Sequence, residues 1–509
     1  MADTRVVVVG AGMAGLVSAL LLAHRGLQVT LLDAAPEPGG KIRRLMVDGA
    51  PIDSGPTVMT MKWIFDGIAQ AVGTRLEHEV RLLPLPVLAR HFWEDGASLD
   101  LFSDPRASLD AVGRFAGAAE AQRFQAFCAQ AREVYDALEG PFIRSAAPSL
   151  GGMVGDLGWR GLSVLSRLGP MRSLWDSLAR YFHDPRLQQL FGRYATYCGS
   201  SPWEAPATLM LIAQVEMDGV WSVEGGMHEL ARALALLAAR RGASVRLNTR
   251  VQRIEMTGGR ATGVILEGGE RLPADRIIFN GDVAALSAGL LGDDARAAAP
   301  PMRPRSLSAL TWSIHAPTDG LALDRHNVFF RRDYRSEFAD IFEAQRLPRQ
   351  PTVYVCAQDR GAAGPQPGAR QLLCLVNAPA VGGRGALTSQ DLDACEHTSF
   401  SLLRHCGLQV SPQPHQVIRT TPDEFHRLFP GTQGALYGQA THGWMSAFSR
   451  SASRSPVPGL FLAGGSVHPG PGVPMAAMSG QLAAEAVMAS LASTSAWRPA
   501  ATSGGMSMH

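Results

Sequence analysis

The chain has 509 residues, a net charge of +2 and a hydrophobic content of 46%. This balance is typical of a globular protein and favours neither a nucleic-acid partner nor a disordered chain. The length exceeds what one simple core fills, so we expect two domains. Six widely spaced cysteines without a CxxC pair, together with isolated histidines, predict neither a disulfide framework nor a metal site.

The first forty residues predict a strand, a glycine turn, a helix and a second strand. Val6–Val9 is a run of four valines, and the glycine-rich segment 10–15 follows at once. Residues 16–24 carry apolar side chains at helical spacing, and Val29–Leu32 is a second β-type run that ends at Asp33. This order is typical of a dinucleotide-binding βαβ unit.

Each glycine of this turn has its own expected role. Gly10 allows the tight turn, Gly12 lets the backbone approach a pyrophosphate, and Gly15 lets the helix lie close to the strand. The N–H groups of Met13 and Ala14 then face the phosphates at the helix start. Asp33 stands at the distance along the chain at which an acidic side chain meets a ribose hydroxyl. The pattern alone leaves NAD and FAD open.

A second glycine pair with a cation, Gly39-Gly40-Lys41, follows shortly after Asp33. Taken alone, the pair is typical of an ordinary loop. In this position it resembles the extension found in flavoproteins of the amine oxidase and carotenoid desaturase superfamily. That resemblance implies that the glycines pass close to FAD and that Lys41 serves the phosphates or the flavin.

Residues 44–60 predict a hairpin that leads to a glycine-proline corner at Gly55-Pro56-Thr57. Segment 53–57 resembles a carotenoid desaturase segment that runs beside the flavin ring. Further along, residues 91–93 and 98–102 predict paired strands, and residues 107–139 predict helices.

Residues 151–190 combine leucine and tryptophan with regularly placed arginine. Such a pattern suits the plane of an anionic membrane surface, although an amphipathic helix over an ordinary core is the commoner case. We expect a peripheral membrane contact here, since no apolar run is long enough to span a bilayer.

The middle of the chain predicts a return to the nucleotide-binding unit. A glycine pair at 225–226 precedes a helical pattern, and residues 244–254, 261–267 and 273–281 each predict a strand. The family resemblance implies that the backbone of Val251 touches the adenine, whereas the residue alone reads equally well as a core valine. Residues 290–450 predict the rest of a second domain, with strands at 306–315, 352–357 and 371–376.

The segment from Gly459 to Gly480 predicts a strand, a glycine turn, a proline-rich loop and a helix start. Small residues at Gly464, Gly465 and Gly472 suit a backbone that meets a flat ring. A helix that opens near Pro474 would direct N–H groups and its positive end at the flavin N1/O2 edge. The segment resembles carotenoid desaturases rather than monoamine oxidases.

These anchors together resemble the FAD-dependent, phytoene-type carotenoid desaturase family over residues 6–487. The resemblance implies an α/β, Rossmann-like FAD-binding domain with a discontinuous α+β substrate domain. The expected FAD-binding domain comprises 1–105, 215–290 and 455–492, the substrate and membrane-facing domain comprises 106–214 and 291–454, and 493–509 is a disordered tail. The cofactor-binding residues are then Gly10, Gly12, Met13, Ala14, Gly15, Asp33, Gly39, Gly40, Lys41, Gly55, Pro56, Thr57, Val251, Gly464, Gly465, Gly472, Val473, Pro474, Met475 and Ala476.

Within the family, segments 55–61, 90–93 and 279–282 are most similar to the branch of purple photosynthetic bacteria that introduces a C3,4 double bond into 1-hydroxy or 1-methoxy carotenoids. Desaturation of this kind transfers a hydride to flavin N5 and releases a proton. A carbocation next to a polyene is delocalised, so no strong base is obliged. Asp53, Glu224 and His468 are weak candidates for the proton acceptor.

Three alternatives stay open at this stage. The nearest is a phytoene desaturase, and the others are a flavin amine oxidase and a non-catalytic lipid carrier on the same fold. The expected partners are a lipid-soluble carotenoid, a membrane surface and quinone or oxygen as electron acceptor. We expect a cytoplasmic protein that associates peripherally with the inner or photosynthetic membrane, since the first strand begins too early for a signal peptide.

Overall fold

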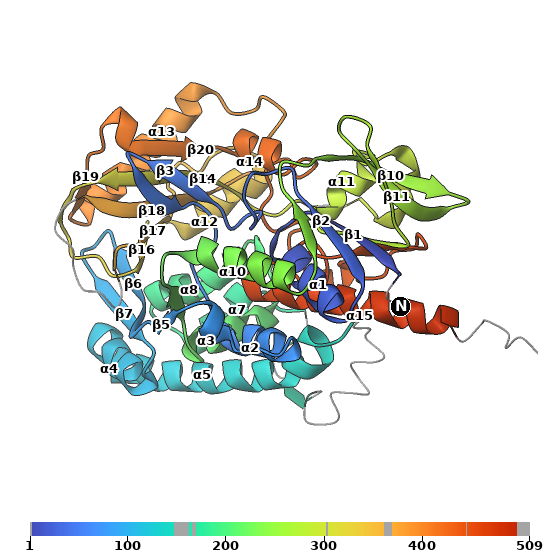
Figure 1. Ribbon diagram of the computed structural model, residues 1–509. Coiled ribbons are helices and arrows are strands. Elements are labelled where there is room, and N and C mark those ends of the chain that lie inside the picture. Colours follow the sequence, from blue (N-terminus) through green and yellow to red (C-terminus); the bar gives the residue numbers. More distant parts are fainter. Residues whose placement is uncertain are drawn as a thin grey trace, which may run out of the picture.

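A computed structural model describes residues 3–146, 161, 163–164, 169, 171–301, 304–360, 369–443 and 445–495. A parallel sheet lies at one end of the molecule, a mixed sheet lies at the other, and helices α4 and α5 form a layer below them (Figure 1). The chain crosses between the two sheets several times, so both are built from segments far apart in the sequence.

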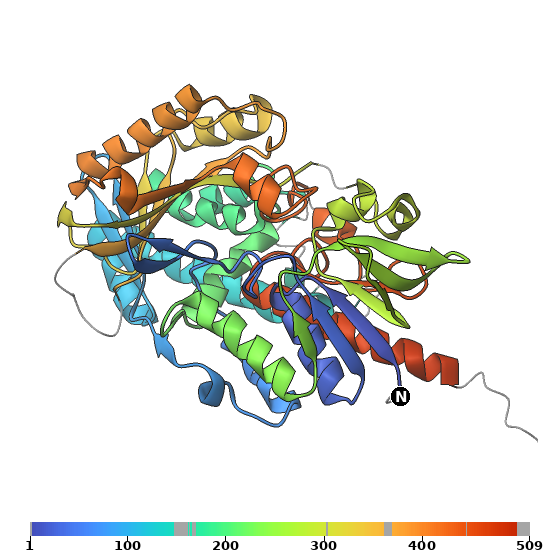
Figure 2. The same ribbon diagram turned by 45° about the horizontal axis from the view of Figure 1, so that its top comes forward.

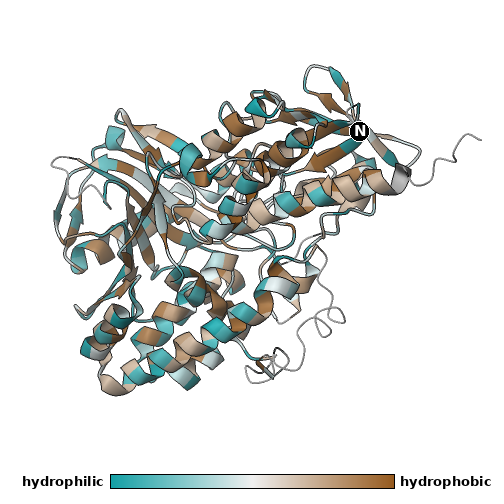
Figure 3. Cartoon of the chain, turned by 60° about the horizontal axis from the view of Figure 1, so that its bottom comes forward, coloured by the Kyte–Doolittle hydropathy of each residue, from teal (hydrophilic) through white to brown (hydrophobic). Residues whose placement is uncertain are grey.

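The first sheet is parallel and five-stranded, in the order β21-β13-β1-β2-β9. Its strands are β1 (Arg5–Val9), β2 (Gln28–Leu32), β9 (Ser244–Arg246), β13 (Arg276–Phe279) and β21 (Leu460–Leu462). Strands covered on both faces read as continuous apolar runs, and those next to the amino terminus are hydrophobic over most of their length (Figure 3). The predicted α/β fold with a Rossmann-like parallel sheet is confirmed.

Three long helices pack together beside this sheet. They are α1 (Met13–His24), α10 (Met227–Arg240) and α15 (Val473–Ser495). A Cβ added at Gly480 of α15 would lie 2.3 Å from the Ala14 carbonyl oxygen of α1, and the Ser18 hydroxyl donates to the Gly480 carbonyl over 2.9 Å. Only a glycine allows this close approach, which fixes the start of α15 relative to the start of α1.

The segment predicted as one strand at 244–254 is two strands, so that prediction is wrong. β9 joins the parallel sheet, and β10 (Val251–Thr257) joins β11 (Arg260–Leu266) and β12 (Arg271–Pro273) in an antiparallel sheet. Asn248 breaks the run with a φ of 51°, and the Thr249 N–H donates to the Asp33 carbonyl over 2.7 Å. The chain therefore wraps over the end of β2 before β10 begins.

The second large sheet is mixed and seven-stranded, in the order β20-β14-β18-β17-β16-β6-β7. Only the β16–β6 pairing among these strands is parallel. The strands are β6 (Val87–Trp93), β7 (Ser98–Phe102), β14 (Ser308–Ala316), β16 (His326–Phe330), β17 (Val353–Ala357), β18 (Arg370–Ala378) and β20 (Val417–Thr420). The predicted pairing of 91–93 with 98–102 is confirmed.

Helices cover both faces of the mixed sheet. α13 (Ser389–His405) runs along its outer side (Figure 2), and its Leu402 shares a core with Trp312 of β14. The other side faces α4 (Pro105–Ala116), α5 (Ala118–Leu138), α7 (Leu174–Tyr181), α8 (Pro185–Gly192) and α9 (Leu211–Met217). The helices predicted within 107–139 are confirmed as α4 and α5.

The remaining elements are short. The helices are α2 (Lys62–Ala71), α3 (Leu76–Glu79), α11 (Val283–Ser287), α12 (Tyr334–Phe338) and α14 (Pro422–Leu428). The strands are β3 (Arg44–Val47), β4 (Ala50–Asp53), β5 (Leu82–Pro84), β8 (Trp221–Val223), β15 (Thr318–Gly320) and β19 (Leu408–Val410). β3 and β4 form the predicted hairpin.

Two predicted segments lie partly outside the described residues. Of the amphipathic stretch 151–190, the structure describes 161, 163–164, 169 and 171–190, which include α7 and most of α8. Of the tail predicted at 493–509, residues 496–509 are not described. α15 itself runs on to Ser495. None of the helices in the described ranges combines the length and apolar content needed to cross a bilayer. Within the same ranges, no three His, Cys, Asp or Glu side chains come together as a metal-binding group.

Candidate flavin and substrate site

A large cavity of about 1680 Å³ is lined by residues of the parallel sheet, the mixed sheet and α9. Val9, Leu32 and Phe279, at the carboxyl ends of β1, β2 and β13, all line it. Ligands of open α/β sheets bind outside the carboxyl ends of the strands. This end of the cavity is therefore the expected nucleotide site.

The turn after β1 is held by an asparagine from another strand. Gly10 has a φ of 103°, and its carbonyl accepts a hydrogen bond of 2.9 Å from the Asn280 side chain. A Cβ at Gly15 would lie 2.0 Å from the Gly10 carbonyl oxygen, and one at Gly12 would lie 3.1 Å from Asn280 Nδ2. The turn thus requires Gly10 for its positive φ and Gly15 for its close packing, and a side chain at Gly12 would press against the Asn280 amide.

The second glycine pair packs directly on the first turn. The Gly39 N–H donates to the Ala11 carbonyl over 2.8 Å, and a Cβ at Gly40 would lie 3.1 Å from the Gly12 Cα. Gly39 and Gly40 both have positive φ values, of 125° and 58°. The two glycine segments therefore form one continuous backbone surface at the cavity.

Asp33 helps to shape this surface. Its Oδ2 accepts a hydrogen bond of 2.6 Å from the Ala11 N–H, and its Oδ1 accepts one of 2.8 Å from the Ala35 N–H. Burial raises the pKa of Asp33, while these two backbone donors act in the opposite direction. Each carboxylate oxygen keeps a further lone pair, so the arrangement leaves acceptor capacity for a ribose hydroxyl.

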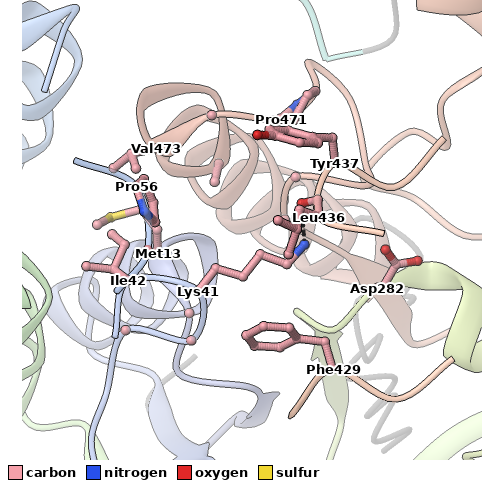
Figure 4. A pocket seen from close by; sticks show the side chains of 18 of the residues that line it. Met13, Lys41, Ile42, Pro56, Asp282, Phe429, Leu436, Tyr437, Pro471 and Val473 are labelled. Carbon is pink, nitrogen blue, oxygen red and sulfur yellow. Dashed lines mark hydrogen bonds between the residues drawn. The ribbon is translucent and has the colours of Figure 1, made fainter. Parts of the chain in front are cut away.

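Lys41 reaches into the cavity without a direct carboxylate partner (Figure 4). Its Nζ donates to the Leu436 carbonyl over 2.5 Å and lies 5.6 Å from the centre of the Phe429 ring. Burial lowers the pKa of Lys41, which the Asp282 carboxylate opposes and the Arg305 guanidinium reinforces. A buried cation of this kind suits a negatively charged ligand.

Two buried polar atoms close to Lys41 have no hydrogen-bond partner among the described residues. They are Oδ2 of Asp282 and Nη1 of Arg305, although the Arg305 Nη1 lies 3.6 Å from the Asp282 Oδ1. Asp282 and Arg450 line the cavity with Lys41. Unsatisfied buried polar groups indicate a bound water, ion or ligand.

The start of α15 forms part of the cavity wall beside the glycine turns. Met13, Pro56 and Val473 lie close to one another there (Figure 4). Gly472 has a φ of 106° and no atom within 4 Å of an added Cβ. A side chain at this position would occupy open space in the cavity, so the glycine keeps a flat surface clear in front of the helix N–H groups.

The predicted cofactor residues converge on this one cavity. Every one of them lines it except Gly15, which lies beneath the turn. Val251 lines it because of the strand break at Asn248.

The three candidate proton acceptors lie elsewhere. Among the described residues that line the cavity, none is Asp53, Glu224 or His468. The Asp53 Oδ2 accepts from the Met227 N–H at the start of α10 over 2.5 Å, and Glu224 forms an exposed ion pair with Arg81. The His468 Nε2 lies 2.9 Å from the Ser145 carbonyl oxygen, and burial lowers the pKa of His468 to about 4.

Away from the glycine turns, the cavity wall is mostly apolar. The mixed sheet and α9 supply Val328, Leu373, Leu375, Ile212 and Val215. Such a wall excludes water and suits a hydrocarbon chain.

A buried polar network interrupts this apolar wall. Both Glu216 oxygens accept tyrosine hydroxyls, from Tyr194 over 2.7 Å and from Tyr197 over 2.6 Å. Arg193 donates to the Tyr197 oxygen over 3.0 Å. Arg193, Tyr197 and Glu216 line the cavity, whereas Tyr194 stands behind it.

Several residues of the site were not predicted from sequence. Asn280 and Asp282 follow β13 and lie in a segment that we used only for its family resemblance. A polar residue at the carboxyl end of a predicted parallel strand was the available signal. Arg193, Tyr354 and Arg450 come from distant segments, and no local pattern marks them.

The residues present fit FAD. A continuous glycine surface, two helix amino termini and the cation Lys41 match a pyrophosphate and a flat ring. Asp282, whose buried Oδ2 has no hydrogen-bond partner among the described residues, lines the same cavity.

Comparison with known proteins agrees with this geometry. Residues 13–488 match the model of the family described as flavin containing amine oxidoreductase. The hydroxyneurosporene desaturase of Rubrivivax gelatinosus is 60% identical, over 99% of this chain and 97% of its own length. The hydroxyneurosporene desaturase of Cereibacter sphaeroides is 47% identical, over 96% and 99%.

The fold has counterparts among solved structures. An oxidoreductase from Methanosarcina mazei has a TM-score of 0.61 at 15% identity and covers 96% of this chain and 100% of its own. At that identity the likeness bears on the fold alone. The family match confirms the predicted flavin cofactor. The chain belongs to the flavin-containing amine oxidoreductase family and, within it, to the carotenoid desaturases.

Proposed function

We propose that the protein is an FAD-dependent desaturase that introduces the C3,4 double bond into acyclic carotenoids with a 1-hydroxy or 1-methoxy end group. The observation that carries this proposal is the full-length similarity to hydroxyneurosporene desaturase. The cavity supports it, because one end is a nucleotide cradle and the rest is an apolar wall.

The reaction removes two hydrogens from adjacent carbons. When bound, FAD supplies the acceptor for a hydride from the C–H bond next to the polyene. The neighbouring carbon releases a proton that finally reaches bulk solvent outside the apolar part of the cavity, one C=C bond forms, and the two electrons pass finally to quinone or oxygen. The apolar wall holds the polyene and excludes water. The N–H groups at the amino terminus of α15 stabilise negative charge that develops next to them.

We assign structural rather than proton-accepting roles to Asp53, Glu224 and His468. Asp53 caps α10, Glu224 pairs with Arg81 at the surface, and His468 packs against Phe142 with ring centroids 5.0 Å apart. Loss of a proton next to a delocalised carbocation does not depend on a strong base, so the proposal needs none of the three.

The proposed cofactor site consists of the glycine turns, Asp33, Lys41, segment 55–57, Val251 and the start of α15. We also propose the domain division expected from the sequence, with 1–105, 215–290 and 455–492 binding FAD and 106–214 with 291–454 binding substrate. The passage of the chain between the two sheets supports this division except at β6 and β7, which lie within 1–105 but pair in the mixed sheet and therefore belong with the substrate half.

We further propose that the protein docks peripherally on the cytoplasmic face of the membrane through segment 151–190. The substrate is soluble in lipid, and Met171, at the described end of that segment, is 84% exposed. A quinone in the same membrane is a suitable electron acceptor, and oxygen is the alternative.

The proposal is tested by pigment analysis in two cell lines. The chain is expressed in cells that accumulate 1-hydroxyneurosporene and, in parallel, in cells that accumulate phytoene. A shift of the carotenoid spectrum by one conjugated double bond only in the first line supports the 3,4-desaturase. New colour in the phytoene line instead makes the protein a phytoene desaturase. No change in either, with folded yellow protein, contradicts carotenoid desaturation and leaves amines as the next substrates.

A further inference from the structure

Three polar side chains form a hydrogen-bonded chain in the cavity wall beside segment 55–57. The Thr57 hydroxyl lies 2.7 Å from the Tyr354 hydroxyl, which lies 2.7 Å from Nδ1 of His326. Thr57 and Tyr354 line the cavity, and His326 stands behind them. His326 is 3% exposed, and its Nε2 has no partner among the described residues.

The backbone fixes this chain next to the cofactor cradle. A Cβ at Gly55 would lie 2.0 Å from the Lys41 carbonyl oxygen, so segment 55–57 is pressed against the second glycine segment. On the mixed sheet, Tyr354 of β17 pairs with Val328 of β16 and with Leu375 of β18. Tyr354 is therefore the polar member of this cross-strand row, and its two neighbours are apolar. It lies directly beside the segment that holds Thr57.

The protonation states follow from burial. Burial, with the nearby Arg325 and Arg193, lowers the pKa of His326 to about 3. Burial also raises the pKa of Tyr354 well above its usual range. The hydrogen-bonded series of Thr57, Tyr354 and His326 is thus neutral. Tyr354 donates to the His326 imidazole, because a phenol is a better hydrogen-bond donor than an imidazole. Thr57 then donates to the tyrosine oxygen, and the threonine oxygen keeps lone pairs that face the cavity.

We propose that Thr57 and Tyr354, positioned by His326, bind the hydroxyl end group of the substrate and make the enzyme prefer hydroxylated carotenoids over hydrocarbons. This inference rests on the proposed function. The 1-hydroxyl group is two carbon–carbon bonds from C3, so its binding partners must stand beside the reacting bond. Thr57 and Tyr354 are neutral, cavity-facing groups in that position.

The other polar network of the cavity wall is less suited to this task. Both oxygens of Glu216 already accept hydroxyls of Tyr194 and Tyr197. In this network Arg193 donates to the Tyr197 oxygen, and Tyr197 in turn donates to Glu216, so the hydrogen-bonding capacity of these side chains is directed at one another. A site that recognises one neutral hydroxyl needs a free neutral acceptor, which the Thr57 oxygen supplies and the Glu216 network does not.

The test compares binding and conversion of two substrates by the purified yellow holoenzyme. The probes are 1-hydroxyneurosporene and neurosporene in matched detergent micelles, with affinity measured by quenching of tryptophan fluorescence. For the native enzyme we expect roughly tenfold tighter binding of the hydroxylated carotenoid, the effect of one buried hydrogen bond. Thr57→Val and Tyr354→Phe should each bring this ratio close to one.

Two controls separate recognition from stability. Thr57→Ser keeps the hydroxyl and should keep the ratio. Tyr194→Phe removes a buried tyrosine hydroxyl that stands behind the cavity wall, and it should also keep the ratio. If Thr57→Val does not fold, Tyr354→Phe decides the question.

The outcomes distinguish this inference from the proposed function. If the native enzyme converts 1-hydroxyneurosporene and both variants retain its preference, the inference is wrong and the proposed function stands. If Tyr194→Phe abolishes the preference while Tyr354→Phe retains it, recognition belongs to the Glu216 network and the inference is wrong. If the native enzyme binds and converts neither carotenoid, the proposed function itself fails.

Discussion

The side-chain amide of Asn280 donates a hydrogen bond of 2.9 Å to the carbonyl oxygen of Gly10, so the end of β13 holds the turn that follows β1. The same amide nitrogen would lie 2.6 Å from a Cβ at Gly15. Asn280 therefore holds the nucleotide turn in place through Gly10, and the absence of a side chain at Gly15 leaves room for its amide.

This packing predicts that Gly15→Ala loses FAD. The new Cβ would stand 2.0 Å from the Gly10 carbonyl oxygen, so the turn must shift, and such overpacking destabilises a protein by about 1–3 kcal/mol. Gly67→Ala is the matched control, because an added Cβ in α2 meets no atom within 4 Å. Flavin absorbance per purified chain and the melting temperature are measured, and full flavin content in Gly15→Ala would contradict the account.

Lys41→Met should weaken retention of FAD while the chain still folds. The methionine fills similar volume but removes the buried charge that directly follows the Gly39-Gly40 pair at the cavity. Lys62, the only other lysine of the sequence, pairs with Asp66 and Glu77 at the surface and provides the control Lys62→Met. The dissociation constant of FAD is measured by flavin fluorescence. Equal affinities for the two variants would remove Lys41 from the cofactor site.

Asp53→Ala should reduce stability more than it reduces turnover. The carboxylate accepts from the Met227 N–H over 2.5 Å, and loss of a helix cap costs about 1–2 kcal/mol. Asp53→Asn keeps an acceptor and should lose less. Unfolding curves and conversion per folded enzyme are compared. A fall in turnover of about a hundredfold in Asp53→Asn at unchanged stability would restore Asp53 as a proton acceptor.

Stability should fall when the pH falls from about 6.5 to about 4. Burial lowers the pKa of His91 to about 3 and the pKa of His326 to about 3. In this range the unfolded chain binds protons that the folded chain does not, so each histidine removes about 1.4 kcal/mol of stability per pH unit.

His91→Gln should remove the contribution of one proton, so the free energy of unfolding should change by about 1.4 kcal/mol less per pH unit. The exposed His24 gives the control His24→Gln, with an unchanged slope. The free energy of unfolding is measured by denaturant titration at several pH values. Identical slopes for native protein and His91→Gln would show that His91 is not buried in its neutral form.

Much of the nucleotide half could be predicted because its determinants are local. The valine run, the spaced glycines and Asp33 lie within one βαβ unit, and each acts on its near neighbours in sequence. The strand at 244–254 was predicted incorrectly because the break at Asn248 depends on hydrogen bonds to Asp33 and Ala35, far away in sequence. The contacts of Asp53 with α10 and of Glu224 with Arg81 could not be predicted for a similar reason, since capping and surface pairing depend on tertiary contacts.

The contacts that form the substrate half of the cavity could not be predicted from the sequence. Tyr354 and Thr57 meet only after β17 has paired within the mixed sheet, and no spacing in the sequence connects them. Apolar strand patterns predict a buried face but do not state which side faces a cavity.

The central claim, flavin-dependent desaturation of a hydroxylated carotenoid, is tested most directly by a single anaerobic turnover. Purified yellow enzyme is mixed with an equimolar amount of 1-hydroxyneurosporene, and the flavin and polyene absorbance are followed together. We expect the flavin band to bleach while the polyene band moves to longer wavelength by one conjugated double bond, in equal molar amounts. An unchanged flavin band with bound carotenoid present would contradict the claim.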